Sequence, residues 1–401
     1  MTEAPRIPLS VLDLAIVPEG GSGAAAIRRA VDLAADLDRW GYRRVWYAEH
    51  HLSPGVASAS PAVLAAAVAA RTERIRVGSG AVLLGTTSPV VAAEQFGTIA
   101  ALHPGRVDLG LGRASVPPRR VDAADGEAAA SSSAPSVPAP PAAGRVVDGL
   151  YVPPPPPVDF DDPALRDRID AQQRLIGAGR TPSALAADLE IVLNLRDGGH
   201  LTDGGDWVSP PADGAAFDLW VLASSPGESA RTAGALGLPL AANYHVSPAT
   251  TLDTIAAYRE AFRPGVLAEP YVIVSADVLA VAEPGQAHEP SGAFADWVAS
   301  IRSGARGAIP FPAPGRGRPW SDRTGSERAL VADRVDTRIV GDPATVVERL
   351  ATLARVTGAD ELLVTTEAHD PAAARASFEL LAGAWGLAGA NPAPGRRTAA
   401  A

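Results

Sequence analysis

The sequence predicts an α/β protein built as a (β/α)8 (TIM) barrel. Eight short apolar stretches are spread along the 401-residue chain, most are followed by apolar residues at helical spacing, and most links are short. Strands that alternate with helices in this way form βα units and a parallel sheet. Eight units fit a closed barrel better than an open sheet. We therefore expect one barrel domain over residues 1–388 and a flexible tail at 389–401.

The first four predicted strands lie before residue 114. Leu9–Val17 is an almost unbroken apolar run, which is the pattern of a strand buried on both faces. Gly20–Gly23 ends it, and Ala24–Trp40 then has helical periodicity. Ser or Pro marks the start of the two later helices. The elements that follow are strand Arg44–Ala48, helix Pro61–Arg71, strand Arg76–Leu84, helix Pro89–Leu102 and strand Arg106–Gly110.

Residues 117–157 interrupt the alternation. They are rich in Ala, Pro and Ser and include five consecutive prolines, Pro153–Pro157. Such a segment buries too little surface to offset the entropy lost on ordering, so it predicts a disordered or extended insertion after strand four. A helix is expected at Asp162–Ile176, and the pattern assigns no regular element to Thr181–Pro211.

Regular units return in the second half of the chain. A second irregular stretch, Ala282–Asp336, separates the last two predicted strands. The expected strands are Asp218–Ala223, Pro239–Tyr244, Tyr271–Ala276 and Glu361–Thr365. The expected helices are Glu228–Leu236, Pro248–Phe262, Pro343–Thr357 and Pro371–Leu387.

Composition excludes several partners. The net charge is −10 and no basic stripe appears, which argues against nucleic acid. No apolar run reaches the roughly 18 residues of a membrane span. The N-terminus, M-T-E-A-P-R-I-P, lacks the pattern of a signal peptide. We therefore expect a soluble, cytoplasmic protein.

Two absent residue types narrow the chemistry. The chain has no cysteine, which excludes thiolate nucleophiles, iron–sulfur clusters and thiolate zinc sites. It also has no lysine, which excludes Schiff-base catalysis and the lysine of a P-loop. No G-x-S-x-G elbow and no H-E-x-x-H motif occurs, so serine and zinc hydrolases fit poorly and no metal site is predicted. The reaction must use other side chains or a borrowed cofactor.

The segment Arg44–Leu52, R-V-W-Y-A-E-H-H-L, carries the main catalytic candidates. A strand pattern runs directly into Glu49, His50 and His51. Active sites of parallel α/β proteins form at the carboxyl ends of strands. Because successive strand residues point to opposite faces, one histidine should face the reaction centre while the other packs or bonds to backbone. A buried pair with satisfied hydrogen bonds is the alternative.

Two further segments suggest an anion site. Gly110–Gly112 is not a dinucleotide fingerprint, because Ser115 replaces the third glycine and prolines follow instead of a helix. The small residues there would let a flat ligand approach the backbone. Arg113 follows and could bind an anion; the alternative is an arginine that is exposed to solvent at the surface. Ser224–Ala230 opens a helix, which makes either a phosphate site or an ordinary cap. Together, Arg113 and this helix start suit one phosphomonoester.

The strand Arg76–Leu84 contains Gly78, Ser79 and Gly80 inside an otherwise buried run. Glycine within a strand marks a bulge or a close approach of backbone to ligand. Tight packing against a neighbouring helix is the alternative.

Taken together, these segments resemble the bacterial luciferase-like family of flavin-dependent monooxygenases. The resemblance covers most of the chain outside the two irregular stretches, in the family's order. Its motifs are S-V-L-D from Ser10, W-Y-A-E-H-H from Trp46, V-G-S-G-A-V-L-L from Val77, A-E-Q-F-G-T from Ala93, P-G-R-V-D-L-G-L-G-R from Pro104, S-S-P-G-E-S-A from Ser224, L-G-L-P-L-A-A-N-Y-H-V-S-P from Leu236 and G-A-D-E-L-L-V from Gly358.

The resemblance implies a barrel that binds reduced FMN at its C-terminal mouth. By position, His50 matches the family's active-site histidine, with Glu49 beside it. Gly80 and Ala81 match the pair that backs the flavin ring, where the family often has a non-proline cis peptide. The phosphate cradle and the ring-side aromatic position match Arg113, Ser225, Ser229 and Tyr244.

The resemblance also implies the reaction. Reduced FMN from a separate flavin reductase would react with O₂ to give a flavin hydroperoxide, which oxygenates a small organic substrate. It further implies a homodimer. The insertion lies where many members have a helix that closes the phosphate site, and it is a candidate lid. Two alternatives stay open: hydride transfer with the deazaflavin F420, and a non-catalytic flavin-binding protein.

Overall fold

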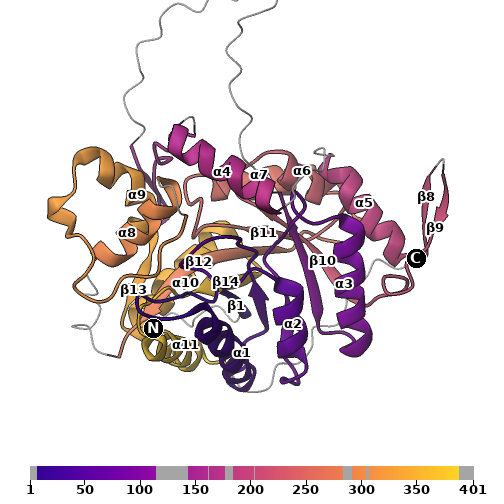
Figure 1. The fold of residues 1–401 in the computed structure, drawn as a ribbon, viewed down its shortest axis with the longest axis horizontal. Helices are drawn as coiled ribbons and strands as arrows, with labels where there is room; N and C mark the ends of the chain where they lie inside the picture. The colour runs from indigo at the N-terminus through magenta and orange to yellow at the C-terminus, as the bar shows by residue number, and fades with distance from the viewer. Residues whose placement is uncertain are drawn as a thin grey trace, which may run out of the picture.

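A computed structural model describes residues 7–113, 143–160, 162–176, 184–202, 204–282, 291–303 and 307–387. Eight parallel strands close into a barrel (Figure 1). Neighbours in the chain are neighbours in the barrel, and β14 pairs with β1 to close it. The strands are β1 Leu9–Asp13, β2 Arg44–Tyr47, β3 Arg76–Ser79, β5 Val107–Gly112, β10 Phe217–Ala223, β11 Leu240–Ala242, β12 Val272–Ala280 and β14 Glu361–Thr365. The predicted (β/α)8 architecture is confirmed.

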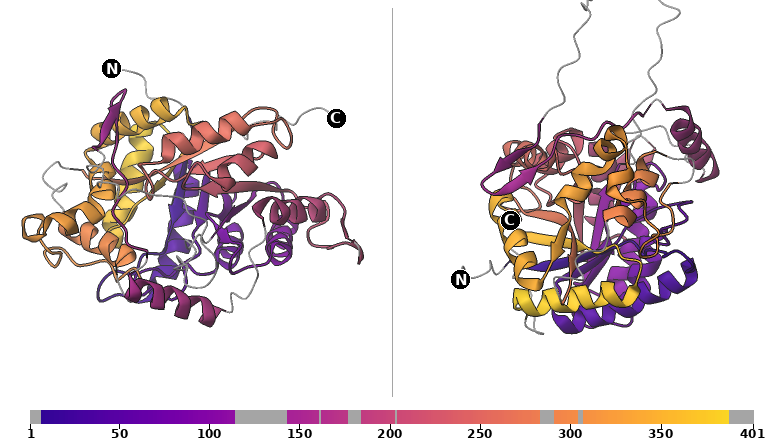
Figure 2. Two further views of the ribbon diagram at one scale, coloured as in Figure 1. Left: turned by 90° about the horizontal axis from the view of Figure 1, so that it is seen from above. Right: turned by 90° about the vertical axis from the view of Figure 1, so that its left-hand side faces the viewer.

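Helices surround the barrel (Figure 2). Several begin where the sequence places a cap: Ser88, Asp342 and Asp370 each accept a hydrogen bond from the first turn, and a proline follows each. The helices between successive barrel strands, and the last one after β14, are α1 Gly23–Trp40, α2 Pro61–Ala69, α3 Pro89–Leu102, α5 Leu185–Arg196, α6 Glu228–Ala235, α7 Thr251–Ala261, α10 Pro343–Thr357 and α11 Pro371–Trp385. No helix in the described ranges is both long and apolar enough to cross a membrane.

Alternation along each strand divides the apolar residues into two packing layers. In β2, Val45 belongs to the outer layer between strands and helices, whereas Trp46 belongs to the layer inside the barrel. Trp46 meets Trp220 edge to face inside the barrel, with ring centroids 5.3 Å apart. The barrel interior is therefore a packed core and not a pore.

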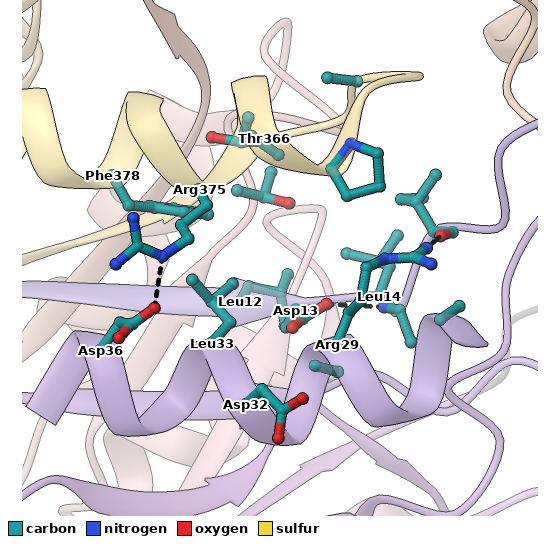
Figure 3. Close-up of a pocket in the computed structure, with 18 residues that line it drawn as sticks. Leu12, Asp13, Leu14, Arg29, Asp32, Leu33, Asp36, Thr366, Arg375 and Phe378 are labelled. Atoms are coloured by element: carbon teal, nitrogen blue, oxygen red, sulfur yellow. Dashed lines mark hydrogen bonds and ion pairs between the residues drawn. The ribbon is translucent and has the colours of Figure 1, made fainter. Parts of the chain in front are cut away.

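A cavity of about 280 Å³ lies outside the barrel, between α1 and α11 (Figure 3). Arg375 of α11 bridges to Asp36 of α1 across it, with Nε 2.6 Å from Oδ2. Asp13 at its wall is buried, which raises the pKa of this carboxyl, and its Oδ1 accepts a 2.7 Å hydrogen bond from the Ala15 amide. None of the predicted site residues lines this cavity.

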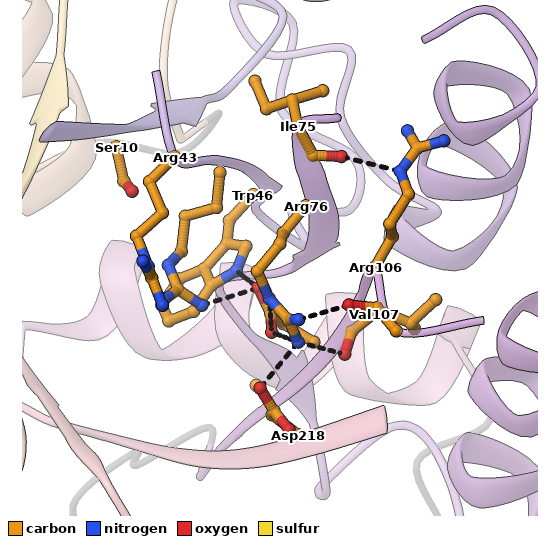
Figure 4. Close-up of polar contacts among 12 residues, drawn as sticks. Ser10, Arg43, Trp46, Ile75, Arg76, Arg106, Val107 and Asp218 are labelled. Carbon is orange, nitrogen blue, oxygen red and sulfur yellow. Dashed lines mark hydrogen bonds and ion pairs between the residues drawn. The ribbon is translucent and has the colours of Figure 1, made fainter. Parts of the chain in front are cut away.

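The amino-terminal end of the barrel is filled by a buried ion network (Figure 4). Arg44 donates to Asp108 at 2.8 Å and to Glu361 at 2.6 and 2.9 Å. Arg76 donates to Asp108 at 2.9 Å through Nε and continues to Asp218 at the rim. Burial alone would raise the pKa of Asp108, but the two guanidiniums outweigh it and hold that pKa below its usual value.

Part of the predicted insertion is regular structure, so its boundary at 157 is wrong. β6 Arg145–Val147 and β7 Leu150–Val152 form an antiparallel hairpin. Leu150 and Val152 are buried, and Arg355 of α10 donates to the Asp148 carbonyl at 2.7 Å. Pattern reading missed the hairpin because its strands are three residues long and its stability comes from tertiary packing. Residues 114–142 and the predicted tail lie outside the described residues.

The two stretches without a sequence assignment also contain regular elements. Before the first of these stretches, α4 Pro163–Ile176 confirms the predicted helix. Within that stretch, α5 is followed by the hairpin of β8 His200–Thr202 and β9 Gly205–Trp207, which projects at the right of Figure 1. The second irregular stretch contains α8 Ser291–Arg302, the short 3-10 helix Trp320–Asp322 and α9 Gly325–Thr337. The capping box of Thr324 and Glu327 could have signalled α9. Two short strands, β4 Val82–Leu83 and β13 Ile339–Gly341, extend the sheet.

Candidate active site at the barrel mouth

A cavity of about 470 Å³ opens beside His50, beyond the carboxyl end of β2. Its wall is mainly apolar, and the charged residue among the described lining residues is Arg168 of α4. The volume lies within the range of small-molecule sites in proteins, roughly 300–1,000 Å³. The apolar lining residues with large side chains are Leu14, Leu52, Val56, Leu175, Trp297 and Ile301.

His50 lines this cavity, and its side chain is exposed. Burial lowers the pKa of His50 to about 4, positive charge on His51 and Arg334 acts in the same direction, and Glu49 opposes them. Access of water from the cavity opposes this desolvation in part. His50 is therefore a neutral imidazole at physiological pH.

His50 lines the cavity and His51 does not; the Nε2 atom of His51 lies 2.8 Å from Oε1 of Glu49 instead. The predicted divergence of the two histidines is thus observed, although His51 bonds to a carboxylate rather than to backbone. Glu49 is almost fully buried. Its other contacts are a 2.9 Å bond from the Leu83 amide and a 2.6 Å bond from the Thr86 hydroxyl. Glu49 thereby ties the end of β2 to the loop after β3.

The peptide bond between Gly80 and Ala81 is cis, as the family resemblance implied. Gly80 packs closely inside the barrel: a Cβ there would lie 3.0 Å from Leu12 Cδ1 and 3.2 Å from Trp46. At Gly78, a Cβ would lie 2.3 Å from the Asp108 carbonyl oxygen. Close packing against neighbouring strands, rather than against a helix, thus accounts for Gly78.

Arg113 reaches the first turn of α6, where its guanidinium forms an ion pair with Glu228. Glu228 also accepts a 3.1 Å hydrogen bond from the Leu185 amide. The N-cap of α6, Gly227, provides no side-chain hydrogen bond to the helix. The structure therefore brings Arg113 next to the segment that contains Ser225 and Ser229. The carboxylate that Arg113 meets belongs to Glu228, the first residue of α6, so the guanidinium is paired with a side chain of the protein itself.

His245, just beyond β11, is a site residue that sequence reasoning missed. It is buried, and its Nδ1 lies 2.5 Å from Ser275 Oγ of β12. Burial lowers the pKa of His245 to about 3, and the nearby charges of Arg334 and His50 contribute. His50 and His245 are therefore close enough to interact electrostatically. The signal was available, since His245 follows a predicted strand just as His50 does.

A second buried charge cluster lies beside these histidines. Arg338 donates to Asp277 at 3.1 Å, and Thr365 donates to Glu367 at 3.0 Å. Asp277 Oδ2 and Glu367 Oε2 are both buried, and no other donor among the described residues reaches them. The two carboxyls can hydrogen-bond if one carries a proton. Burial, reinforced by Asp277, raises the pKa of Glu367 well above its usual value.

Tyr244 lies in the outer packing layer, beside His245 in sequence but facing the other way. Its hydroxyl donates to the Tyr151 carbonyl at 2.7 Å and so anchors the β6–β7 hairpin. Burial raises the pKa of Tyr244 above the physiological range. Its predicted contact with a flavin ring stays a prediction.

Comparisons with known proteins decide the family. The model described as "Luciferase-like monooxygenase" matches residues 8–131 and 190–361. The chain belongs to the luciferase-like monooxygenase family. A protein named luciferase-like monooxygenase from Escherichia coli (strain K12) is 33% identical over 376 residues, which covers 93% of this chain and 96% of the relative. Membership in this family makes the chain an oxidoreductase by class.

Two solved structures show the same barrel. The crystal structure of apo-MsnO8 has a TM-score of 0.69 and 29% identity, covering 95% of this chain and 98% of that one. The oxygenating constituent of 3,6-diketocamphane monooxygenase from Pseudomonas putida, a type II Baeyer–Villiger monooxygenase in complex with FMN, has a TM-score of 0.57. The two sequences are 19% identical, and the match covers 94% of this chain and 96% of that protein. At this identity the similarity shows a shared fold and nothing more.

Proposed function

We propose that this protein is a monooxygenase that uses reduced FMN and O₂ to oxygenate a small organic substrate. The observation that supports this most is the position of Arg113, whose guanidinium reaches the first turn of α6 through its ion pair with Glu228. This arrangement and the His50 cavity both lie at the carboxyl ends of barrel strands. A planar cofactor with an anionic tail, such as FMN, suits such a mouth.

The residues fit a flavin phosphate by charge and by position. Arg113, the hydroxyls of Ser225 and Ser229, and the free amides of α6 would hold it, once Glu228 releases Arg113. The backbone at Gly80 and Ala81 would lie behind the ring. When bound, reduced FMN would supply the two electrons for a monooxygenation, in which one atom of O₂ enters the substrate and the other leaves as water.

His50 would act beside the reacting atoms. Its neutral imidazole can accept a proton at one nitrogen and donate one from the other, which suits general acid–base chemistry. Glu49 would act as a positioning residue, because its oxygens hold His51 and the loop after β3. The apolar wall of the cavity would keep water from the reaction. A separate flavin reductase would supply the reduced cofactor, and a homodimer is the expected assembly.

Titration of the anaerobic protein with reduced FMN and with F420, followed by visible absorption, tests the cofactor. We expect saturable binding of FMN and none of F420. The proposal fails if the protein neither binds FMN nor consumes O₂ when reduced FMN is present. Saturable F420 binding without FMN binding would instead favour hydride transfer, and FMN binding without turnover of any substrate would favour a non-catalytic flavoprotein.

Replacement of Arg113 tests the phosphate site separately. Loss of a charge-assisted contact of about 1.5–3 kcal/mol should weaken FMN binding about 10- to 100-fold in Arg113→Gln. Binding of riboflavin, which has no phosphate, should not change. Arg231→Gln is the matched control, because Arg231 is an exposed arginine on the same helix. Equal losses for FMN and riboflavin would place the phosphate elsewhere.

Replacement of His50 tests the acid–base role. His50→Ala should lower substrate-dependent O₂ consumption by about 10²- to 10⁴-fold while FMN affinity stays within about twofold. His200→Ala, on the projecting β8–β9 hairpin, serves as the control and should keep full turnover. Full turnover in His50→Ala would remove His50 from the mechanism.

A further inference from the structure

The guanidinium of Arg168 stands at the wall of the His50 cavity without a counterion. Its Nη2 donates to the Ile301 carbonyl at 3.4 Å, a long contact, and its Nε and Nη1 are buried without any acceptor. No carboxylate of the described residues lies within ion-pair distance of it. Burial lowers the pKa of Arg168, which shows that the protein desolvates this cation.

A desolvated cation without a counterion is costly, and four arginines among the described residues avoid this arrangement. Arg44 and Arg76 have carboxylate partners within 3 Å. Arg302 and Arg323, which lie in or near the same α8–α9 region, each meet a carboxylate at 2.5 Å. Arg168 is only partly buried as a residue, but two of its nitrogen atoms are buried, and it differs from these four arginines because no carboxylate of the described residues meets it.

The cavity wall has no acidic residue among those described, although the whole chain has a net charge of −10. His50, on the same wall, is neutral because burial lowers its pKa to about 4. A positive guanidinium in a largely apolar cavity favours a ligand with one anionic group and an apolar body. The planar fork of arginine matches a carboxylate in particular.

Helix α4, which contains Arg168, is also tied to the segment that contains His50. Gln172 lies one turn further along α4, on the same face, and its amide donates to the His51 carbonyl at 2.7 Å. In Figure 1, α4 lies across the top of the barrel. This bond keeps the Arg168 side of α4 beside the segment that carries His50.

We propose that Arg168 binds the carboxylate of the substrate and so selects small organic acids with an apolar body. This proposal rests on the proposed function, because it assigns the substrate class to the same cavity. Arg168 would be a specificity-determining residue and not a proton donor. The apolar body would lie along Leu14, Val56 and Trp297, within reach of His50.

Binding without flavin tests the proposal. Octanoate and N-acetylmethionine, each paired with its uncharged carboxamide, are titrated against the full chain by calorimetry. Quenching of tryptophan fluorescence gives a second readout, because Trp297 lines the cavity. A charge-assisted hydrogen bond of about 1.5–3 kcal/mol predicts that at least one acid binds about tenfold or more tightly than its amide.

Substitution of Arg168 should remove this preference. Arg168→Gln should bring acid and amide to within about twofold, and Arg168→Lys should keep part of the preference. Arg174→Gln is the matched control, because Arg174 is an exposed arginine on α4 outside the cavity wall. Circular dichroism confirms that each variant is folded.

The outcomes separate this proposal from the proposed function. If no acid binds more tightly than its amide, or if Arg168→Gln keeps the preference, the carboxylate role is overturned. If Arg168→Gln instead weakens FMN binding, Arg168 serves the cofactor and the proposal is equally overturned. Failure of the wild-type protein to bind FMN would sink the proposed function, while the preference for acids would still be measured independently.

Discussion

The two ends of the barrel interior hold two buried charge clusters that differ in how they are satisfied. At the amino-terminal end, each carboxylate oxygen of Asp108 and Glu361 accepts two hydrogen bonds. At the carboxyl end, Asp277 and Glu367 each have one buried oxygen without a donor among the described residues, unless one carboxyl keeps a proton and shares it with the other. Complete satisfaction stabilises a fold, whereas incomplete satisfaction is typical of a site that binds or titrates.

The same contrast appears in the pKa shifts. Asp108 is buried, yet Arg44 and Arg76 hold its pKa below the usual value, so it stays charged. Glu367 is equally buried, but its pKa is raised well above the usual value, so it keeps its proton. At one end of the barrel each carboxylate is paired with guanidinium groups, whereas at the other the raised pKa of Glu367 leaves it beside Asp277, which alone of the two is paired with Arg338.

Breaking the lower cluster should have the largest effect. Asp108→Asn leaves Arg44 and Arg76 buried beside an uncharged amide, which should lower the free energy of unfolding by about 3–5 kcal/mol. Urea denaturation measures this change. Asp218→Asn is the control, because this carboxylate is half exposed at the rim and should cost about 1 kcal/mol or less. Similar losses for both variants would contradict the idea of a tightly coupled buried network.

The buried histidine of the mouth should give a smaller, pH-dependent effect. Because the folded pKa of His245 is about 3 and its ordinary value is 6.5, the unfolded chain binds a proton that the folded chain excludes. Stability should therefore fall as the pH falls below about 6.5, by up to about 1.4 kcal/mol per pH unit.

In His245→Asn, which has no titrating group at this position, that loss should be smaller. We expect a difference of about 2 kcal/mol between pH values of about 6.5 and 5. Urea denaturation at several pH values measures it. His50 acts in the same direction but is accessible from the cavity, so its contribution is smaller. If the free energy of unfolding depends on pH in the same way in wild type and variant, His245 binds its proton equally well in the folded and the unfolded chain.

Neutralising the upper acid should have the smallest effect. Glu367→Gln replaces a carboxyl that is already protonated when folded, so near pH 5.5 it should cost less than about 1 kcal/mol, in contrast to Asp108→Asn. The sign of the pH effect is opposite to that of His245. The wild type should lose stability as the pH rises above 4.5, the ordinary pKa, and the variant should lack this loss. A large loss of stability at low pH in Glu367→Gln would show that Glu367 is charged.

Much of the fold followed from local pattern. The buried run at β1, the helix starts at Pro89 and Pro343, and the order of strands are all signals of neighbouring residues. Helix α5 was missed because it is apolar on several faces and its cap, Ala184, makes no side-chain hydrogen bond. Helix α8 and the hairpin β6–β7 depend on packing against distant elements, which no local pattern records.

The sequence alone therefore determined the barrel, the absence of thiol and amine chemistry, and His50 at the end of a strand, because strand and helix periodicities are properties of adjacent residues. Only the tertiary structure decided which charges meet. Arg168 reaches the wall of the His50 cavity across more than a hundred residues of chain, and Arg334 approaches His245 from α9. Such encounters depend on closure of the barrel and on its added helices, and residue spacing along the chain does not encode them.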